Sequence, residues 1–375
     1  MQEIKKRRIV IASVLKPVDD TRMFEKIAVS LSGMYAVHVI GFESGANEAS
    51  TLAPSVWCHS LGRFNRLSMK RLFTPFRIFG IAFKIKPDLI IITTHELLCA
   101  ALLLKLVTGC KIVYDIQENY AQNIYYGSTV PVFLRLPLSI SVRVREWLVS
   151  IFVAHFLLSE KSYATELGFI RNRYSVLQNK LGVVPVLKKR EPISSKKKIT
   201  LLFSGTLTTT TGVFTAIELT AALNREDPRI HLCIIGYASQ GVIRSRIKNA
   251  VADKPFVEVV GLDQLVEHRR ILDKVRECDL GIIAYPPNPS THTAFPTKLF
   301  EYLGYQLPIL LIENKAWVDY CKAYDAAIVF DMSTLESKAL LHDILTKQFF
   351  TKYPEDVFWR SQESALQSVV TDVLG

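Results

Sequence analysis

Apolar residues along the chain fall into short runs of isoleucine, valine and leucine that alternate with amphipathic stretches. Continuous apolar runs separated by helices are typical of a parallel sheet that is buried on both faces. In the first half of the chain, the pattern predicts strands at 8–15, 36–42, 88–94, 111–116, 152–159 and 173–179, with helices at 20–33 and 96–108.

The pattern restarts after a polar, proline-bearing stretch that reads as a linker. Further strands are predicted at 199–205, 230–237, 257–262, 280–286 and 308–312, with a helix at 212–224. The α/β alternation predicts two Rossmann-like βαβ domains that face an interdomain cleft. The predicted division is an N-terminal domain at 1–187, a linker at 188–198, a C-terminal domain at 199–356, and a helix at 357–375 that can cross back to the first domain.

Charge is distributed unevenly between the two halves of this 375-residue chain of net charge +11. Residues 1–190 hold 26 Lys and Arg against 13 Asp and Glu, whereas residues 191–375 hold 20 against 22. The excess of positive charge therefore lies in the first half, which indicates that the two halves have different partners.

Targeting and redox features point to a cytoplasmic protein. The basic start of the chain leads into a strand pattern and lacks the features of a signal peptide, and no apolar run is long and uncharged enough to span a bilayer. The six cysteines are scattered without a C-x-x-C pair, so we expect buried thiols and neither disulfides nor a metal site.

The stretch "FPTKLFEYLGYQLPIL" (295–310) carries the main candidate chemistry. Pro296 suits the first turn of a helix, on which Lys298 and Glu301 would share one face. A helix N-terminus and a lysine favour an anion, and a carboxylate one turn further on can accept two hydrogen bonds from a ribose diol. The alternative is an ordinary amphipathic helix start in which Lys298 is solvated.

A second anion-binding candidate is "LFSGTLTTTTGVF" (202–214), a strand, a glycine-bearing turn and a helix that begins near Gly212. It matches neither a G-x-G-x-x-G nor a Walker A pattern, so it supports neither a dehydrogenase nor a kinase. Two such helix starts in one domain favour a nucleotide diphosphate as the ligand.

These motifs carry a family resemblance when taken in order. "SGT", "IIGY", "VVGL", "CDLGIIAYPPN" and "PTKLFEYLGYQLPIL" resemble the nucleotide-sugar domain of GT-B glycosyltransferases, specifically the GT4-like retaining group. The first half agrees through its opening strand and D-x-R helix, "KPDLIIITTHELLCA" and "KIVYDIQENY", and the likeness covers nearly the whole chain.

The resemblance implies roles for individual residues. Glu301 would bind the ribose hydroxyls, Lys298 would lie near the diphosphate, and Gly205 and Gly212 would let the backbone approach it. Tyr285 and the loop 286–295 would line the pocket for the base and the sugar. The family needs no metal or other cofactor, so none is expected.

Three features depart from the family's pattern, at four positions. Thr293 stands where a second glutamate touches the donor sugar, Gln117 replaces a histidine, and Thr206 and Thr211 stand in place of a basic pair. A threonine cannot neutralise a leaving diphosphate as a cation does. Lys298 and backbone N–H groups would have to supply most of that stabilisation.

The resemblance implies transfer of a sugar from a nucleotide diphosphate sugar to a hydroxyl, with retention at the anomeric carbon. His95 and Glu96 follow a predicted strand of the first domain and, with Gln117, are the catalytic or acceptor-side candidates. Asp115 and Glu118 are further candidates at the edge of the same site. Asp20 is expected to cap the first helix. The alternatives are a non-catalytic nucleotide-sugar-binding protein and a nucleotide-sugar 2-epimerase.

The basic segments of the first half indicate the kind of surface at which the protein binds its acceptor. No acidic residue lies between Glu48 and Asp88, and "RFNRLSMKRLFTPFRIFGIAFKIK" (63–86) mixes seven Lys and Arg with apolar residues; 119–145 is also free of acids. This composition favours an anionic membrane surface over nucleic acid. We therefore expect a cytoplasmic protein at the inner face of the membrane, with a glycan or lipid-linked acceptor.

Overall fold

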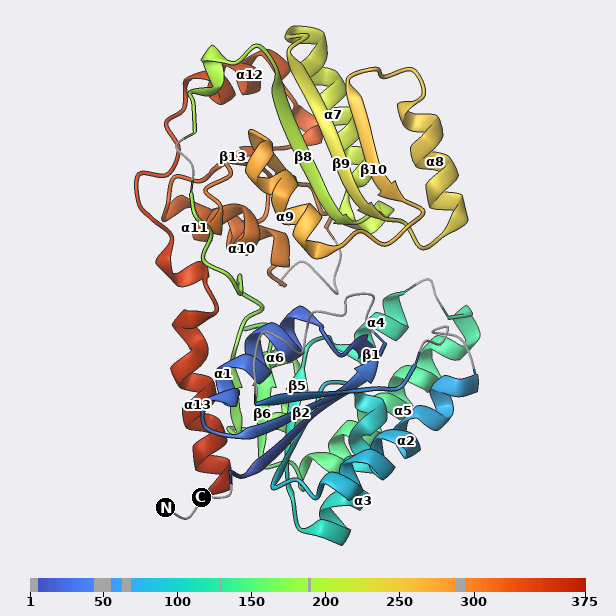
Figure 1. Ribbon diagram of the computed structural model, residues 1–375. Coiled ribbons are helices and arrows are strands. Elements are labelled where there is room, and N and C mark those ends of the chain that lie inside the picture. Colours follow the sequence, from blue (N-terminus) through green and yellow to red (C-terminus); the bar gives the residue numbers. More distant parts are fainter. Residues whose placement is uncertain (1–5, 44–54, 63–68, 128–129, 188–189, 288–293) are drawn as a thin grey trace. The chain divides into compact units, whose positions relative to one another are not determined.

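The computed structural model describes residues 6–43, 55–62, 69–127, 130–187, 190–287 and 294–375 (Figure 1). The chain divides into two compact units. The first comprises the described residues up to Gly182 together with Trp359–Gly375, and the second is Val183–Phe358.

A parallel sheet forms the centre of the first unit. Its described strands number seven, in the order β3-β2-β1-β4-β5-β6-β7. The strands are β1 Arg8–Pro17, β2 Ala36–Phe42, β3 Val56–Ser60, β4 Leu89–Ile92, β5 Lys111–Ile116, β6 His155–Leu158 and β7 Tyr174–Val176. In the register, Val10 pairs with His38 on one side and Ile90 on the other. Since β1 lies inside the sheet, its apolar residues are buried on both faces.

Helices cover both faces of this sheet (Figure 1). One face packs against α2 Met69–Ile85, α3 Leu98–Thr108 and α5 Val132–Ser150. The other packs against the π-helix η1 Thr21–Ala28, α1 Val29–Ser32 and α13 Arg360–Leu374. Shorter helices are η3 His95–Leu97, α4 Tyr120–Tyr126, α6 Tyr163–Glu166 and η4 Gly168–Ile170.

The start of η1 is held by a cap and a buried ion pair. The Asp20 carboxylate accepts hydrogen bonds from the backbone N–H groups of Arg22 and Met23, as the predicted cap requires. Arg22 reaches into the core and forms a bidentate pair with Asp115, Nε at 2.9 Å and Nη2 at 2.6 Å. Its remaining nitrogen donates to the carbonyl of Leu177, so one side chain ties together η1, β5 and the end of β7.

The last helix, α13, belongs to the first unit. Trp359 donates from its indole to the Ser30 hydroxyl, and Gln362 exchanges two hydrogen bonds with the backbone of Gln178. Leu366 and Val370 are buried against the sheet. This helix supplies the apolar cover that the short η1 and α1 leave incomplete.

The second unit has a parallel sheet of six described strands, in the order β10-β9-β8-β11-β12-β13. The strands are β8 Ile199–Thr206, β9 Ile230–Tyr237, β10 Val257–Leu262, β11 Leu280–Ile283, β12 Ile309–Ile312 and β13 Ala327–Phe330. One face packs on α7 Val213–Glu226, α8 Gly241–Val251 and α12 Ser337–Thr346. The other face packs on α9 His268–Glu277, α10 Thr297–Gly304 and α11 Lys315–Lys322. The described 3₁₀ turns of this unit are η5 Ile193–Ser195, η6 Thr209–Thr211, η7 Met332–Thr334 and η8 Glu355–Val357.

The α/β class and the two parallel sheets agree with the sequence pattern, with some corrections. β3 and β13, each at a sheet edge, were missed. Pro296 precedes α10 instead of opening its first turn. Cys58 and Cys99 are exposed, contrary to the expected burial of the thiols. Within the described residues, none of the helices is both long and apolar enough to cross a membrane.

The ion pair of Arg22 generates a stability prediction. Arg22→Met leaves the Asp115 carboxylate buried without its cation, which should destabilise the first unit by about 3–5 kcal/mol. Calorimetry of the full chain should show a clearly lowered melting temperature for one transition. The control is Lys16→Met, which removes the partly exposed Lys16–Asp20 pair and should cost no more than about 1 kcal/mol. Equal losses in the two variants would contradict this assignment.

Candidate functional site

The predicted site helix, α10, lies at the carboxyl end of the second sheet. Tyr302 fixes it there: its ring packs directly on Gly281 of β11, where a Cβ atom would lie only 2.3 Å from the ring. Its hydroxyl is 2.9 Å from the hydroxyl of Ser204 on β8. Helix and sheet are therefore joined by a buried aromatic contact and a hydrogen bond, which holds the adjacent turn of α10 in place.

Lys298 on this helix is buried without a counter-ion. Its side chain is 6% exposed, and its Nζ has no hydrogen-bond partner within the described residues. Two aromatic rings make cation–π contacts with it: Nζ lies 4.3 Å from the centroid of Phe203 and 5.0 Å from that of Tyr285. Burial lowers the pKa of Lys298 to about 7, although Glu301 acts in the opposite direction. Among the described residues no acceptor bonds to the Lys298 Nζ, and an incoming anion would supply one.

Glu301, one turn along, is also buried and has a partner that the sequence did not reveal. Its Oε1 lies 2.8 Å from Nε2 of His268, the first residue of α9. His268 is about one-third exposed, whereas the Glu301 side chain is only 7% exposed. A carboxylate held by one fixed donor is oriented, and its second oxygen can accept a further hydrogen bond from a hydroxyl.

The predicted glycine turn lies beside Lys298. Gly205 has φ +99°, and its Cα faces the Lys298 side chain: a Cβ there would lie 3.9 Å from Cε. Gly212 has φ +85°, and a Cβ would lie 1.8 Å from the carbonyl oxygen of Ala284, so only glycine fits. The turn between them exposes the Thr206 side chain and leads into the N-terminus of α7.

The threonines of this turn are largely structural. Thr208 and Thr211 form a reciprocal capping box, in which each hydroxyl accepts from the other's backbone N–H. The Thr211 hydroxyl also donates to the carbonyl of Thr206 at 2.7 Å. Thr211 therefore stabilises the turn. The sequence shows Thr211 only as a residue that stands where the family has a basic one, and does not predict this structural role.

Tyr285 follows β11 and completes the surroundings of Lys298. Its ring meets that of Trp317 edge-on, with centroids 5.9 Å apart, and the Trp317 indole donates to the carbonyl of Ala294. Burial raises the pKa of Tyr285, so its hydroxyl stays protonated at neutral pH. Thr293 lies outside the described residues, as does most of the loop 286–295.

In the first unit, His95 and Glu96 lie in η3, directly after β4. Side-chain atoms of three consecutive residues here are buried without a hydrogen-bond partner in the described structure: Thr94 Oγ1, His95 Nδ1 and Glu96 Oε2. Burial, with Arg145 and Arg71 nearby, lowers the pKa of His95 to about 4, so the imidazole is neutral. Arg71 holds the other carboxylate oxygen of Glu96. The unsatisfied polar atoms of this unit thus include three in one short segment that follows β4.

Gln117 follows β5 in the same unit and is held by the buried ion pair. Its Nε2 donates to Asp115 Oδ2 at 2.8 Å, and its backbone carbonyl accepts from Ser159. The carboxamide oxygen can still accept a hydrogen bond. Asp115, expected at the edge of the site, is instead fully buried beneath Gln117 and paired with Arg22. Glu118 is exposed and accepts a hydrogen bond from Asn123.

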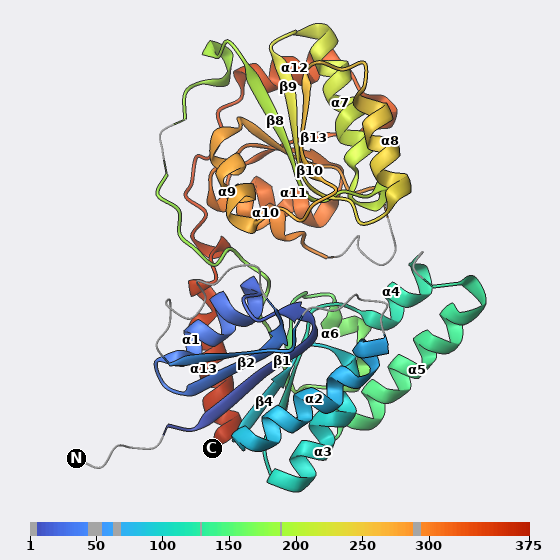
Figure 2. The same ribbon diagram turned by 45° about the vertical axis from the view of Figure 1, so that its right-hand side comes forward.

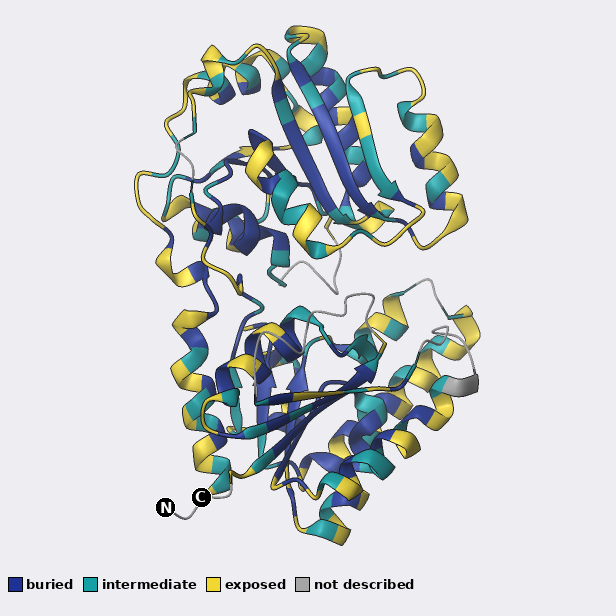
Figure 3. Ribbon diagram, in the orientation of Figure 1, coloured by how far each residue is buried: buried dark blue, intermediate teal, exposed yellow. Residues whose placement is uncertain are grey.

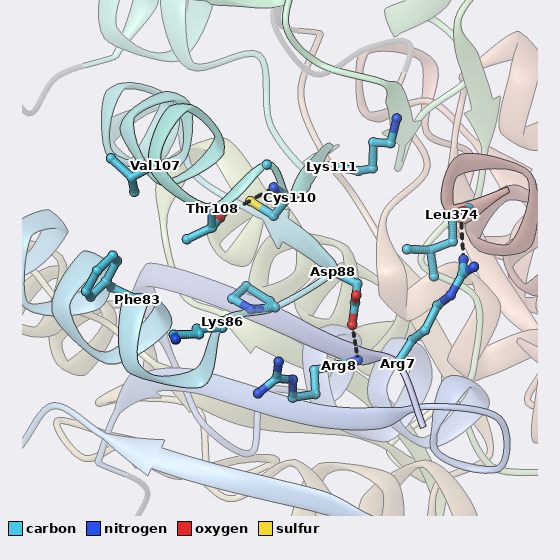
Figure 4. Close-up of a pocket in the computed structure, with 12 residues that line it drawn as sticks. Arg7, Arg8, Phe83, Lys86, Asp88, Val107, Thr108, Cys110, Lys111 and Leu374 are labelled. Carbon is cyan, nitrogen blue, oxygen red and sulfur yellow. Dashed lines mark hydrogen bonds between the residues drawn. The ribbon is translucent and has the colours of Figure 1, made fainter. Parts of the chain in front are cut away.

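One open pocket of about 680 Å³ lies away from all these residues (Figure 4). It is lined by Arg8, Asp88 and Lys111 at the amino ends of β1, β4 and β5, the opposite edge of the sheet from His95 and Gln117. Arg7 in this pocket donates to the terminal carbonyls at Leu374 and Gly375. No group of three or more His, Cys, Asp or Glu able to hold a metal is found across the described ranges.

Comparison with solved structures identifies the fold. No protein-family model and no curated protein matches the sequence. Structures that match over the whole chain include a sucrose-phosphate synthase from Thermosynechococcus elongatus, with a TM-score of 0.65, 11% identity, and coverage of 98% of this chain and 96% of that one. A UDP-forming trehalose-phosphate synthase from Burkholderia xenovorans matches with a TM-score of 0.62, 12% identity and coverage of 99% and 100%.

A third match is the Anabaena protein HepE, solved with UDP and glucose, with a TM-score of 0.59, 14% identity, and coverage of 98% of this chain and 96% of that one. At these identities the likeness establishes the arrangement of the chain alone. It agrees with the two doubly wound parallel sheets found here. The chain therefore has the GT-B fold, the fold of these glycosyltransferases.

Proposed function

We propose that the protein is a glycosyltransferase that uses a nucleotide diphosphate sugar as donor. The observation that carries the proposal is the buried Lys298 ammonium, which has no counter-ion among the described residues. It lies beside the Gly205 turn, where backbone groups can approach a phosphate closely. A diphosphate bound there supplies the missing charge, and the solved structures of the same fold include one with UDP and glucose.

The second donor contact is assigned to Glu301. Its carboxylate is fixed by His268 one helical turn from Lys298, which is the spacing between a ribose and the diphosphate that follows it. Tyr285 is assigned to the wall beside the base and sugar. The Lys298 Nζ lies 5.0 Å from the centroid of this ring, so a diphosphate at Lys298 and the sugar attached to it would both lie beside Tyr285.

The proposed reaction forms a bond between an acceptor hydroxyl oxygen and the anomeric carbon, while the bond from that carbon to the diphosphate oxygen breaks. The departing diphosphate takes the hydroxyl proton from the same face, so configuration is retained and no protein base is needed. Lys298 stabilises the charge that develops on the diphosphate. A neutral His95 suits this route, because it can accept a hydrogen bond from a hydroxyl without competing for the proton.

The proposed acceptor is a glycan or a lipid-linked saccharide, bound by the first unit along Thr94, His95, Glu96 and Gln117. The unpartnered side-chain atoms of Thr94, His95 and Glu96 support this assignment. The positive charge of the first half favours an acceptor presented at the anionic inner face of a membrane.

A second candidate function is binding of a nucleotide sugar without turnover. It is favoured by the turn 206–211, where neutral threonines occupy the place of a basic pair and Thr211 is committed to a capping box. This candidate predicts that a nucleoside diphosphate binds at Lys298 while no donor is consumed. A 2-epimerase on the same fold would release free nucleotide and a new sugar without any acceptor.

The first test of the proposed site is Glu301→Ala. UDP and GDP should each be screened for thermal stabilisation of the full chain, followed by a panel of their sugar conjugates with product analysis. For the preferred nucleotide, loss of two hydrogen bonds to the ribose should weaken binding by about 2–3 kcal/mol, roughly 30- to 150-fold. Glu258→Ala, which removes an exposed carboxylate from β10, is the matched control and should bind normally. Unchanged affinity in Glu301→Ala would reject this assignment.

The second test uses the pH dependence of binding. A bound diphosphate favours the charged form of Lys298, so its pKa rises on binding, and above pH 7 each binding event must take up a proton. Affinity for the nucleoside diphosphate should fall between pH 7 and pH 9, by up to about tenfold per unit. Calorimetric titration of Lys298→Met should show weak binding with a flat profile over this range. An equally steep decline in the variant would place the titrating group elsewhere.

The third test concerns folding. Since the folded-state pKa of Lys298 lies below its unfolded value, the unfolded chain binds more protons between pH 7 and pH 10, and this residue destabilises the fold most at low pH. Lys298→Met should therefore raise the free energy of unfolding by a few kcal/mol at pH 6. The gain over the wild type should shrink toward pH 10. Urea unfolding at the two pH values measures this difference, and a destabilised variant would contradict it.

A further inference from the structure

Helix α5 presents its apolar stripe to solvent. One face of the helix carries an apolar residue every three or four positions, at Phe133, Leu136, Ile140, Val144 and Trp147, and Ile151 continues the spacing at the C-cap. All six are exposed, from 78% at Phe133 to 49% at Val144. A surface helix ordinarily turns such a stripe toward the core. Here the stripe faces the other way.

The inner side of α5 carries an acidic residue whose hydrogen bonds are satisfied. Glu146 is buried between Val142 and Val149, accepts a hydrogen bond from the Tyr114 hydroxyl at 3.2 Å, and pairs with Arg143 at 2.9 Å. Arg143 also donates to Asn119. These contacts fix the orientation of the helix, so the outward stripe is a property of the folded unit.

The two neighbouring helices extend the same surface. α3, which contacts both α2 and α5, exposes Leu103 and Leu106, and α2 exposes Leu72, Phe76 and Phe83. Figures 1 and 2 show the three helices side by side, and Figure 3 shows their outer sides exposed. We name this surface the three-helix face. A contiguous apolar surface of this kind marks a site of interaction.

Charge on the three-helix face has one sign. Arg77 and Lys84 on α2 are exposed, and Lys105, Arg135 and Arg145 are partly exposed on α3 and α5. The three helices carry a single acidic residue, Glu146, and it is buried. A protein partner or a second copy would have to supply all the acids, whereas a lipid surface with anionic headgroups matches apolar side chains and a rim of cations together.

We propose that the three-helix face inserts into the interfacial layer of an anionic bilayer, with the α5 stripe among the acyl chains and the cations at the headgroups. Long cationic side chains at the rim can reach headgroups while their stems stay in apolar surroundings. This inference deepens the proposed function by stating how the first unit holds the surface that presents a lipid-linked acceptor. The proposed function invoked only attraction between the basic first half and an anionic surface. The inference adds that the apolar side chains of the α5 stripe enter the bilayer.

The test measures lipid binding without donor or acceptor. The full-length protein is mixed with vesicles of pure phosphatidylglycerol or pure phosphatidylcholine, and with phosphatidylglycerol whose acyl chains carry bromine, a quencher of tryptophan fluorescence. Trp317 and Trp359 are buried, whereas Trp57 and Trp147 are exposed. We expect binding to phosphatidylglycerol and quenching that survives Trp57→Phe and disappears in Trp147→Phe, since Phe keeps the apolar contact while removing the reporter.

A triple variant tests the energetics. Phe133→Ser, Ile140→Ser and Trp147→Ser together should weaken vesicle binding on the order of a hundredfold, because each exposed side chain gives up apolar burial in lipid. The matched control is Val242→Ser with Leu265→Ser, two exposed apolar residues of the second unit, which should bind vesicles normally. Melting temperature should stay unchanged in both, as none of these side chains packs in the core.

Two results would overturn the proposal. One is quenching by bromine that persists in Trp147→Phe. The other is a dimer, found by sedimentation equilibrium without lipid, that the triple variant dissociates while vesicle binding is unaffected. Neither result bears on nucleotide binding, which Glu301→Ala tests separately in the second unit.

Discussion

A buried lysine, Lys298, whose Nζ has no hydrogen-bond or ion-pair partner among the described residues, is the constraint around which the second unit is organised. Lys298 loses its hydration, and the faces of Phe203 and Tyr285 offset only part of that cost. The residue persists in this position because Tyr302, Ser204 and Gly281 fix α10 against the sheet. We propose that Lys298 is held in this position to bind a ligand that supplies an anion. The Gly205 turn and the oriented Glu301 then read as the rest of that ligand's surroundings.

The fold could be predicted from the sequence because its main signal is local. Strands such as β5 and β9 are buried on both faces, so they appear as uninterrupted apolar runs with the observed bounds. Two edge strands carried weaker signals. β3 has the sequence VWCHS, in which apolar and polar residues mix because only part of it is buried, and β13 is four residues long. Partial burial in β3 and short length in β13 weaken the apolar run that identifies the other strands.

The site could be predicted only as far as it lies within single segments. The three-residue spacing of Lys298 and Glu301 places them on one helix face, and a glycine that must adopt positive φ is visible at Gly212. Partners from distant segments gave no such signal: His268 lies 33 residues from Glu301, and Arg22 lies 93 residues from Asp115. The assignment of Asp115 to the site edge was wrong for this reason, since its position after a strand could not reveal the arginine that buries it.

Periodicity has a further limit, which α5 exposes. Spacing establishes which residues share a helix face but not whether that face turns inward, because both orientations have the same period. The orientation is decided here by Tyr114, Arg143 and Glu146, whose hydrogen bonds hold the Glu146 side of α5 against the sheet. The apolar side is thereby left to solvent, which folding alone does not favour. Lys298 and the α5 stripe are thus opposite departures from the usual distribution, a cation inside and apolar residues outside. Under the two proposals made above, a binding event relieves each of them, an anion for Lys298 and lipid for the α5 stripe.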